Sequence, residues 1–158
     1  MKLVKAFKTI CIYLCLLGTF SAYSQNRILK KGNKEYDKYA FINSREYYLE
    51  LAAKDSVPEE LLERLGDSYY FNADYMNAAK WYQRLIVDYK QPKPEYIYRY
   101  ALSVKTTGNY TVSDSLMNAF YVMKGDDYRA QLFNKQRNYL KEIEQQSGRF
   151  TVKLSNFN

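Results

Sequence analysis

The chain has 158 residues, of which 47% are hydrophobic, so it is long enough for one modest domain with a packed core. It contains no histidine, and its two cysteines, Cys11 and Cys15, lie near the N-terminus. This composition excludes His-dependent catalytic triads and zinc sites of the usual Cys/His kind. The formal net charge of +7 makes the chain basic.

The first 24 residues have the organisation of a secretory signal peptide. Lys2, Lys5 and Lys8 precede an apolar run from Ile10 to Leu17, and small residues follow up to Ser24. We predict cleavage after Ser24, which would leave a mature chain without cysteine and with a formal charge of +4. We therefore expect an exported protein, without a cysteine nucleophile and without a nucleic-acid partner.

Two other readings of this segment fit less well. A membrane anchor would need about 20 apolar residues, and the run from Ile10 to Leu17 is shorter. A lipoprotein signal would need a small residue directly before the cysteine, but Leu14 precedes Cys15.

Small and large residues recur along the rest of the chain with a spacing of about 34 residues, which is typical of helical repeat arrays. Each recurrence combines two small residues in the first two positions with two large residues in the last two. The four positions hold Gly32, Ser44, Tyr48 and Leu51, then Gly66, Ala78, Tyr82 and Leu85, then Ala101, Ser113, Met117 and Phe120. The pattern predicts an all-α array of about three helix pairs plus a capping helix, over residues 25–147.

The first helix pair is expected over residues 25–53, with a break near Ala40–Asn43 that contains no glycine. The second pair opens on a capping-box signature. Ser56 is expected to cap the helix, Pro58 to lie in its first turn and Glu59 to complete the box.

Turn and cap residues delimit the remaining helices. Asn72–Asp74 predicts the turn of the second pair, Pro94 opens the next helix, and Gly108 suits the left-handed residue that closes it. Gly125–Asp127 predicts the cap of a final helix over Tyr128–Gln146.

The final helix has an apolar stripe, and we expect it to cover the open end of the array. The stripe consists of Leu132, Phe133, Tyr139, Leu140 and Ile143. Residues 149–154 then alternate like a strand that has nothing nearby to pair with. We interpret residues 148–158 as an extended tail or as the start of a missing β domain.

These residues resemble the tetratricopeptide repeat, whose consensus combines small and aromatic residues around a tight turn. The matching residues are Leu65, Gly66, Tyr69, Ala78 and Tyr82 in the second pair and Gly108, Tyr110 and Ser113 in the third. The resemblance covers about residues 25–124 and implies a helical hairpin array.

A narrower resemblance points to the N-terminal region of Bacteroidota OmpA-family envelope proteins. It rests on the runs Leu65–Asp74, Ala78–Tyr82, Glu95–Ala101 and Ser147–Val152. In that family a β-propeller-like region and a peptidoglycan-binding OmpA-like domain follow the repeats. The resemblance implies a periplasmic protein associated with the outer membrane. It also implies a barrel partner of the PorP/SprF type, a possible link to type IX secretion or gliding, and peptidoglycan contact only through a domain absent here.

The repeat family also implies where a partner would bind, because its first helices line the concave face. The outward positions expected there are Tyr36, Asp37, Glu63, Asp67, Tyr70, Phe71, Tyr98, Leu102 and Lys105. Aromatic residues flanked by charges suit a peptide groove.

Catalysis is not expected from this sequence. The acidic pairs Glu59–Glu60 and Asp126–Asp127 begin helices, where negative charge favours the helix dipole, and no cofactor or metal motif appears. We therefore predict a non-catalytic scaffold for protein binding in the periplasm. The alternative is a glycan-binding module like the SusD proteins of the same bacteria.

Overall fold

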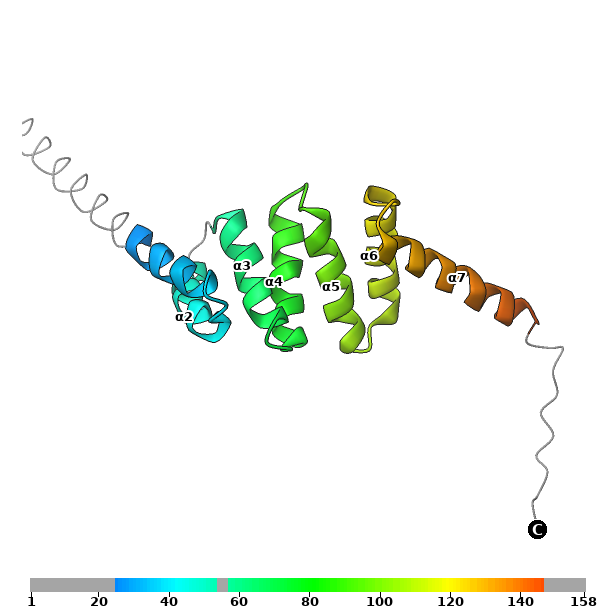
Figure 1. Ribbon diagram of the computed structural model, residues 1–158, viewed down its shortest axis with the longest axis horizontal. Coiled ribbons are helices and arrows are strands. Elements are labelled where there is room, and N and C mark those ends of the chain that lie inside the picture. The colour runs from blue at the N-terminus through cyan, green and yellow to red at the C-terminus, as the bar shows by residue number, and fades with distance from the viewer. Residues whose placement is uncertain (1–24, 54–56, 147–158) are drawn as a thin grey trace, which may run out of the picture. The chain divides into compact units, whose positions relative to one another are not determined.

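The computed structural model describes residues 25–53 and 57–146, and every regular element within these residues is a helix (Figure 1). The predicted signal peptide, the predicted cap Ser56 and the predicted strand at 149–154 lie outside the described residues. The chain divides into two compact units, one ending at Pro92 and the other beginning at Lys93. Each unit is described separately.

The N-terminal unit contains two helical hairpins. A helix over residues 25–36 and α2 (Phe41–Ala52) form the first, and α3 (Glu59–Tyr70) and α4 (Tyr75–Asp88) form the second. Helix α3 lies between α2 and α4, in contact with both. The turn of the first hairpin spans residues 37–40, slightly earlier than the predicted break.

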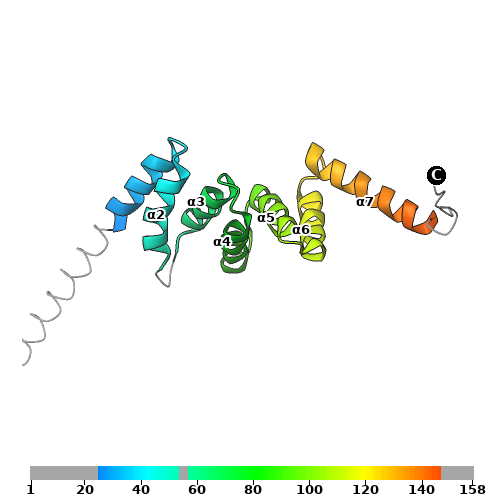
Figure 2. The ribbon, with the colours of Figure 1, turned by 90° about the horizontal axis from the view of Figure 1, so that it is seen from below.

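The C-terminal unit contains the third hairpin and one more helix. Helices α5 (Pro94–Thr106) and α6 (Tyr110–Met123) lie side by side in both views, and α7 (Tyr128–Gln146) packs on α6 (Figures 1 and 2). The predictions for the start of α5 at Pro94 and for the bounds of α7 are confirmed. None of the helices in the described ranges combines the length and the apolar character that a membrane crossing requires.

The start of α3 differs from the predicted capping box. Pro58 is the residue before the helix rather than part of its first turn, and among the described residues no side chain caps this end. The Pro58 carbonyl accepts the N–H groups of Leu61 and Leu62 at 3.0 and 3.3 Å. Proline lacks an N–H, and its fixed φ suits this entry into the helix.

The packing inside each of the first two hairpins depends on a glycine facing a tyrosine. A Cβ placed on Gly66 would lie 2.6 Å from Cδ1 of Tyr82, and one on Gly32 would lie 2.7 Å from Cε1 of Tyr48. Both tyrosines are fully buried. The missing side chain therefore makes room for the ring, and the spacing seen in the sequence is a packing requirement.

Each hairpin turn uses a residue with positive φ at the same repeat position. These residues are Tyr39 at 62°, Ala73 at 59° and Gly108 at 85°. Around Ala73, the Ala73 N–H donates to the Tyr70 carbonyl and the Asp74 N–H donates to the Tyr69 carbonyl, each at 3.0 Å. This is the Schellman arrangement that ends many helices. The prediction for Gly108 is confirmed, and the other two turns adopt the same conformation without glycine.

The apolar stripe of α7 is less covered than a capping helix would need. Phe133 is half-buried and Ala130 is fully buried, but Tyr139 is 61% exposed and Ile143 is 47% exposed. The expectation of an end cap therefore holds only for the first half of α7, which packs on α6. The side chain of Leu140 lies outside the described part.

The turn conformations predict opposite effects for two substitutions. Ala73→Gly should raise the free energy of unfolding by about 0.5–1 kcal/mol, because an L-residue pays to adopt positive φ and glycine does not. Gly108→Ala should lower it by a similar amount, since an added Cβ would meet nothing within 4 Å and only the backbone is strained. Urea unfolding followed by circular dichroism measures both. Equal effects of the two changes would contradict this account.

The ring-on-glycine packing predicts a coupled pair of substitutions. Gly66→Ala alone should cost about 1–3 kcal/mol through overpacking against Tyr82. In a Tyr82→Met background, which copies the third hairpin, the same change should cost less than about 0.5 kcal/mol. A double-mutant cycle of urea unfolding measures the coupling. A cost that is unchanged by Tyr82→Met would show that the ring does not set this distance.

Candidate functional site

Two of the residues predicted to face outward are buried. Glu63 and Asp67 are each 3% exposed. Asp67 accepts a hydrogen bond from the Tyr82 hydroxyl at 2.6 Å and another from the Tyr36 hydroxyl at 2.7 Å. The residue after the glycine therefore faces the neighbouring helices, and its carboxylate links the first hairpin to the second. The predicted outward placement of Glu63 and Asp67 is therefore wrong, because both side chains are buried inside the unit.

Tyr36 and Asp37 lie beside Arg64 of α3. The guanidinium carbon of Arg64 is 4.9 Å from the centre of the Tyr36 ring, and Arg64 Nη1 is 3.4 Å from Asp37 Oδ1. The Asp37 side chain is 69% exposed, whereas Tyr36 is half-buried. Of this pair, only Asp37 presents most of its side chain to solvent.

Tyr70 and Phe71 belong to an aromatic cluster at the turns of the N-terminal unit. Phe71 stacks on Phe41 with ring centres 5.0 Å apart, and Tyr70 meets Tyr75 edge to face at 5.6 Å. Phe71 remains 49% exposed. The cluster therefore joins the two hairpins mainly through ring packing.

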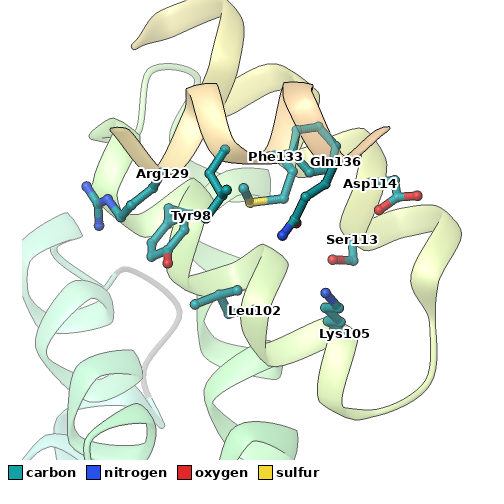
Figure 3. Close-up of a pocket in the computed structure, with 10 residues that line it drawn as sticks. Tyr98, Leu102, Lys105, Ser113, Asp114, Arg129, Phe133 and Gln136 are labelled. Carbon is teal, nitrogen blue, oxygen red and sulfur yellow. The ribbon is translucent and has the colours of Figure 1, made fainter. Parts of the chain in front are cut away.

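The three predicted residues of the C-terminal unit are brought together in a pocket of about 200 Å³ (Figure 3). Tyr98, Leu102 and Lys105 contribute to it from α5. The other lining residues come from α6 and α7, and they are Ser113, Asp114, Met117, Arg129, Leu132, Phe133 and Gln136. We call this cavity the α5–α7 pocket.

The pocket lies in the third hairpin, at the position where each of the first two hairpins has a pair of hydrogen-bonded side chains. In those hairpins the residue after the glycine accepts a hydrogen bond from the buried tyrosine, Asn33 from Tyr48 at 2.9 Å and Asp67 from Tyr82 at 2.6 Å. In the third hairpin Leu102 and Met117 occupy the corresponding positions, and both line the pocket. A shorter, apolar pair thus replaces a ring and its hydrogen bond.

Arg129 forms one wall of the pocket and is held firmly. Its Nη2 lies 2.8 Å from Glu95 Oε2 and 2.9 Å from Asp127 Oδ2, and its guanidinium carbon is 4.2 Å from the centre of the Tyr98 ring. The hydrogen bonds that Arg129 donates to Asp127 and then to Glu95 raise the pKa of Arg129. Its charge is largely offset by two carboxylates, so its main effect is to fix Tyr98 and the start of α7.

The same contacts lower the pKa values of both carboxyl groups. Burial alone would raise the pKa of Glu95, but the hydrogen bond from Arg129 and the charges of Arg99 and Arg129 outweigh it and lower that pKa below 4.5. The side-chain and backbone hydrogen bonds of Arg129 lower the pKa of Asp127 below 3.8. Asp127 thereby confirms its predicted capping role, because it accepts the Arg129 backbone N–H at 2.8 Å.

Two polar groups of the pocket, the Lys105 amine and the Gln136 amide, belong to exposed residues and are available to a ligand. Among the described residues, Lys105 is in no ion pair, and the hydroxyl of Ser113 makes no hydrogen bond although Ser113 is only 1% exposed. In Figure 3 the Lys105 amine and the Gln136 amide point into the space between α5 and α7. The pocket therefore combines an apolar lining with a few convergent hydrogen-bonding groups, which is the usual chemistry of a binding site.

The predicted site residues include none from α7, because the sequence prediction assigns α7 the role of a cap. One signal in the sequence could have revealed them. Helix α7 begins 34 residues after α5, and Arg129 bonds to Glu95 across that same separation. By this spacing α7 corresponds to the first helix of a further hairpin, whose residues take part in the site as those of α5 do.

The described residues contain no group of three or more histidine, cysteine, aspartate or glutamate side chains that could hold a metal ion.

Comparison with known proteins identifies the class of fold. No protein-family model and no curated protein matches the chain. Among solved structures it is similar to PcrH, in the crystal structure of PcrH in complex with the chaperone binding region of PopB. The TM-score is 0.55 and the identity 11%, over 73% of this chain and 93% of PcrH. At this identity the likeness shows the fold, which is a tetratricopeptide-like helical hairpin array.

The contacts of Arg129 predict a pH-dependent loss of stability. Arg129→Met should lower the free energy of unfolding at pH 7 by about 0.5–1 kcal/mol through the partly exposed pair with Glu95. The folded-state pKa values of Glu95 and Asp127 are lowered, so this stabilisation is present above their ordinary values of 4.5 and 3.8 and disappears as the pH falls through the lowered ones.

Urea unfolding of both chains between pH 7 and pH 2.5 measures this difference. Lys80→Met is the matched control, since the Lys80 amine contacts Asn77 Oδ1 at 3.3 Å and no carboxylate of the described residues. A difference between wild type and Arg129→Met that stays constant down to pH 2.5 would contradict the assignment.

Proposed function

We propose that the protein is a non-catalytic scaffold that binds a protein partner, and that the α5–α7 pocket receives one apolar side chain of an extended segment of that partner. The observation that carries this proposal is the pocket itself, which lies where the third hairpin has Leu102 and Met117 in place of the hydrogen-bonded tyrosine pair. Its lining is mainly apolar, and Lys105 and Gln136 can hydrogen-bond to the backbone beside the inserted side chain.

The size of the pocket favours a side chain over a small molecule. Sites for cofactors and drug-sized ligands have volumes of roughly 300–1,000 Å³. The α5–α7 pocket has about 200 Å³. A pocket of this size suits an anchor residue, the kind of contact that dominates the affinity of protein interfaces.

The similarity to PcrH supports the same proposal. PcrH has a comparable array and was solved with a region of its partner PopB bound. Helical arrays commonly present the first helices of their hairpins to ligands, and Tyr98, Leu102 and Lys105 lie on such a helix.

We further propose where this binding takes place. The predicted signal peptide supports export to the periplasm. The resemblance to the N-terminal region of OmpA-family envelope proteins supports a partner in the outer membrane, a barrel of the PorP/SprF type. In this proposal the array docks or anchors an outer-membrane complex, such as one of the type IX secretion or gliding machinery.

A glycan-binding role finds less support in the pocket. Sugars bind to open aromatic faces, but the Tyr98 ring is 4.2 Å from the Arg129 guanidinium carbon and 5.2 Å from the centre of the Phe120 ring. Tyr98 therefore has little free ring surface to offer.

Site-specific photo-crosslinking in cells tests the proposal. A photoreactive amino acid at Lys105 should form a covalent adduct with an outer-membrane barrel protein. The same amino acid at Val122, which is 76% exposed on α6, should not. An equal yield at both positions, or adducts only with soluble proteins, would count against the proposed partner.

A variant that closes the pocket provides the second test. Ala101→Gly, Leu102→Asp and Met117→Tyr together place the residues of the second hairpin into the third. We expect this variant to keep its helical circular dichroism and to lose at least about tenfold in affinity for the crosslinked partner. Unchanged affinity in the folded variant would show that the pocket does not hold the anchor. Saturable oligosaccharide binding in calorimetry, lost in this variant, would favour the glycan alternative.

A further inference from the structure

The helix over residues 25–36 carries a continuous basic face. Arg27, Lys30, Lys31 and Lys34 are all exposed and follow the spacing of one helix face. They extend over two turns, roughly 10 Å along the axis. We call these four residues the basic face.

The packing of this helix fixes the direction of the basic face. The opposite side contains the buried Gly32, which lies against Tyr48, and Asn33, which accepts a hydrogen bond from the Tyr48 hydroxyl at 2.9 Å. Ile28 and Leu29 on that side are half-buried. The helix cannot turn its cations inward without breaking these contacts, so they remain presented to solvent.

No described carboxylate neutralises the basic face. Its four residues are in no ion pair among the described residues, whereas Lys38, shortly after them, pairs with Glu35 at 3.0 Å. Residues 1–24 contain no aspartate or glutamate either. Like charges three or four residues apart destabilise a helix, and the basic face has four such pairs. The nearest described carboxylates, Glu35 and Asp37, pair with Lys38 and Arg64 instead, so the basic face keeps a positive charge that suits an anionic partner.

We infer that the basic face binds the phosphate headgroups of anionic lipids at a bilayer surface. Four point charges in a row, with no aromatic or apolar anchor among them, match a surface of many phosphates better than one shaped protein ligand. With the predicted cleavage after Ser24, the basic face begins at the third residue of the mature chain, Arg27. This is a different surface from the α5–α7 pocket, and it does not depend on the protein partner proposed above.

Vesicle sedimentation of the mature chain, residues 25–158, tests this inference. We would compare vesicles of phosphatidylcholine containing 30% phosphatidylglycerol with vesicles of phosphatidylcholine alone. The ratio of the two partition coefficients isolates the charge effect, because the two kinds of vesicle differ only in anionic lipid. At low salt the ratio for the wild type should be roughly 100, since each basic residue near an anionic surface contributes a several-fold gain. It should fall towards one in 0.5 M salt.

Two variants with the same net charge locate the effect. Arg27→Gln, Lys30→Gln, Lys31→Gln and Lys34→Gln together remove the basic face, and glutamine keeps the helix propensity. Lys80→Gln, Lys90→Gln, Lys124→Gln and Lys135→Gln together remove four exposed cations elsewhere. The first variant should lose the preference for anionic vesicles while keeping its circular dichroism, and the second should retain most of it.

Three outcomes would overturn the inference. Equal losses in the two variants would reduce the effect to net charge. If the wild type does not prefer anionic vesicles, anionic lipid is not the ligand of the basic face. Binding to polyglutamate that depends on the basic face, without binding to anionic vesicles, would assign the face to an acidic protein.

Discussion

A tyrosine ring packed on a glycine sets the geometry of the first two hairpins. The ring of Tyr82 occupies the place where a Cβ on Gly66 would be, and its hydroxyl ends on the buried Asp67. That carboxylate also accepts a hydrogen bond from the Tyr36 hydroxyl. The residue that closes one hairpin therefore also joins it to the previous one. A change in this set of residues therefore alters both the packing inside a hairpin and the packing between hairpins. The third hairpin shows the consequence, because Ala101, Leu102 and Met117 leave a pocket there.

The repeat positions and most helix ends could be predicted because they follow from local rules. Pro94 at a helix start and Asp127 as a cap each act within a few residues of themselves, and the small residues are recognised by their fixed spacing. The burial of Asp67 could not be predicted in this way. A carboxylate at such a position is outward unless two hydroxyls from other helices reach it, and one of them comes from Tyr36, 31 residues away. The turns at Tyr39 and Ala73 have no glycine to mark their positive φ.

The candidate site shows the same division between local and distant information. Tyr98, Leu102 and Lys105 could be named because a repeat family assigns a face to its first helices. Arg129, Phe133 and Gln136 do not follow from the apolar pattern, because an amphipathic last helix has the same pattern whether it closes an array or continues it. In the sequence, the 34-residue spacing between α5 and α7 is the signal that indicates them. The exposure of Tyr139 and Ile143 in the second half of α7 distinguishes the two roles of a last helix, and it appears only in the structure.

The two proposed surfaces have different chemistry. Together they explain how a small pocket could be enough to bind a partner. A single side chain in a cavity of about 200 Å³ supplies limited affinity, since much of the gain from burial is lost to the cost of association. A basic face acts through charge, needs no shape match and holds a protein near a surface. A protein held at the membrane that contains its partner meets that partner at a high effective concentration. Binding by the basic face would therefore make a weak pocket selective for membrane-embedded partners, while soluble segments of similar sequence would dissociate.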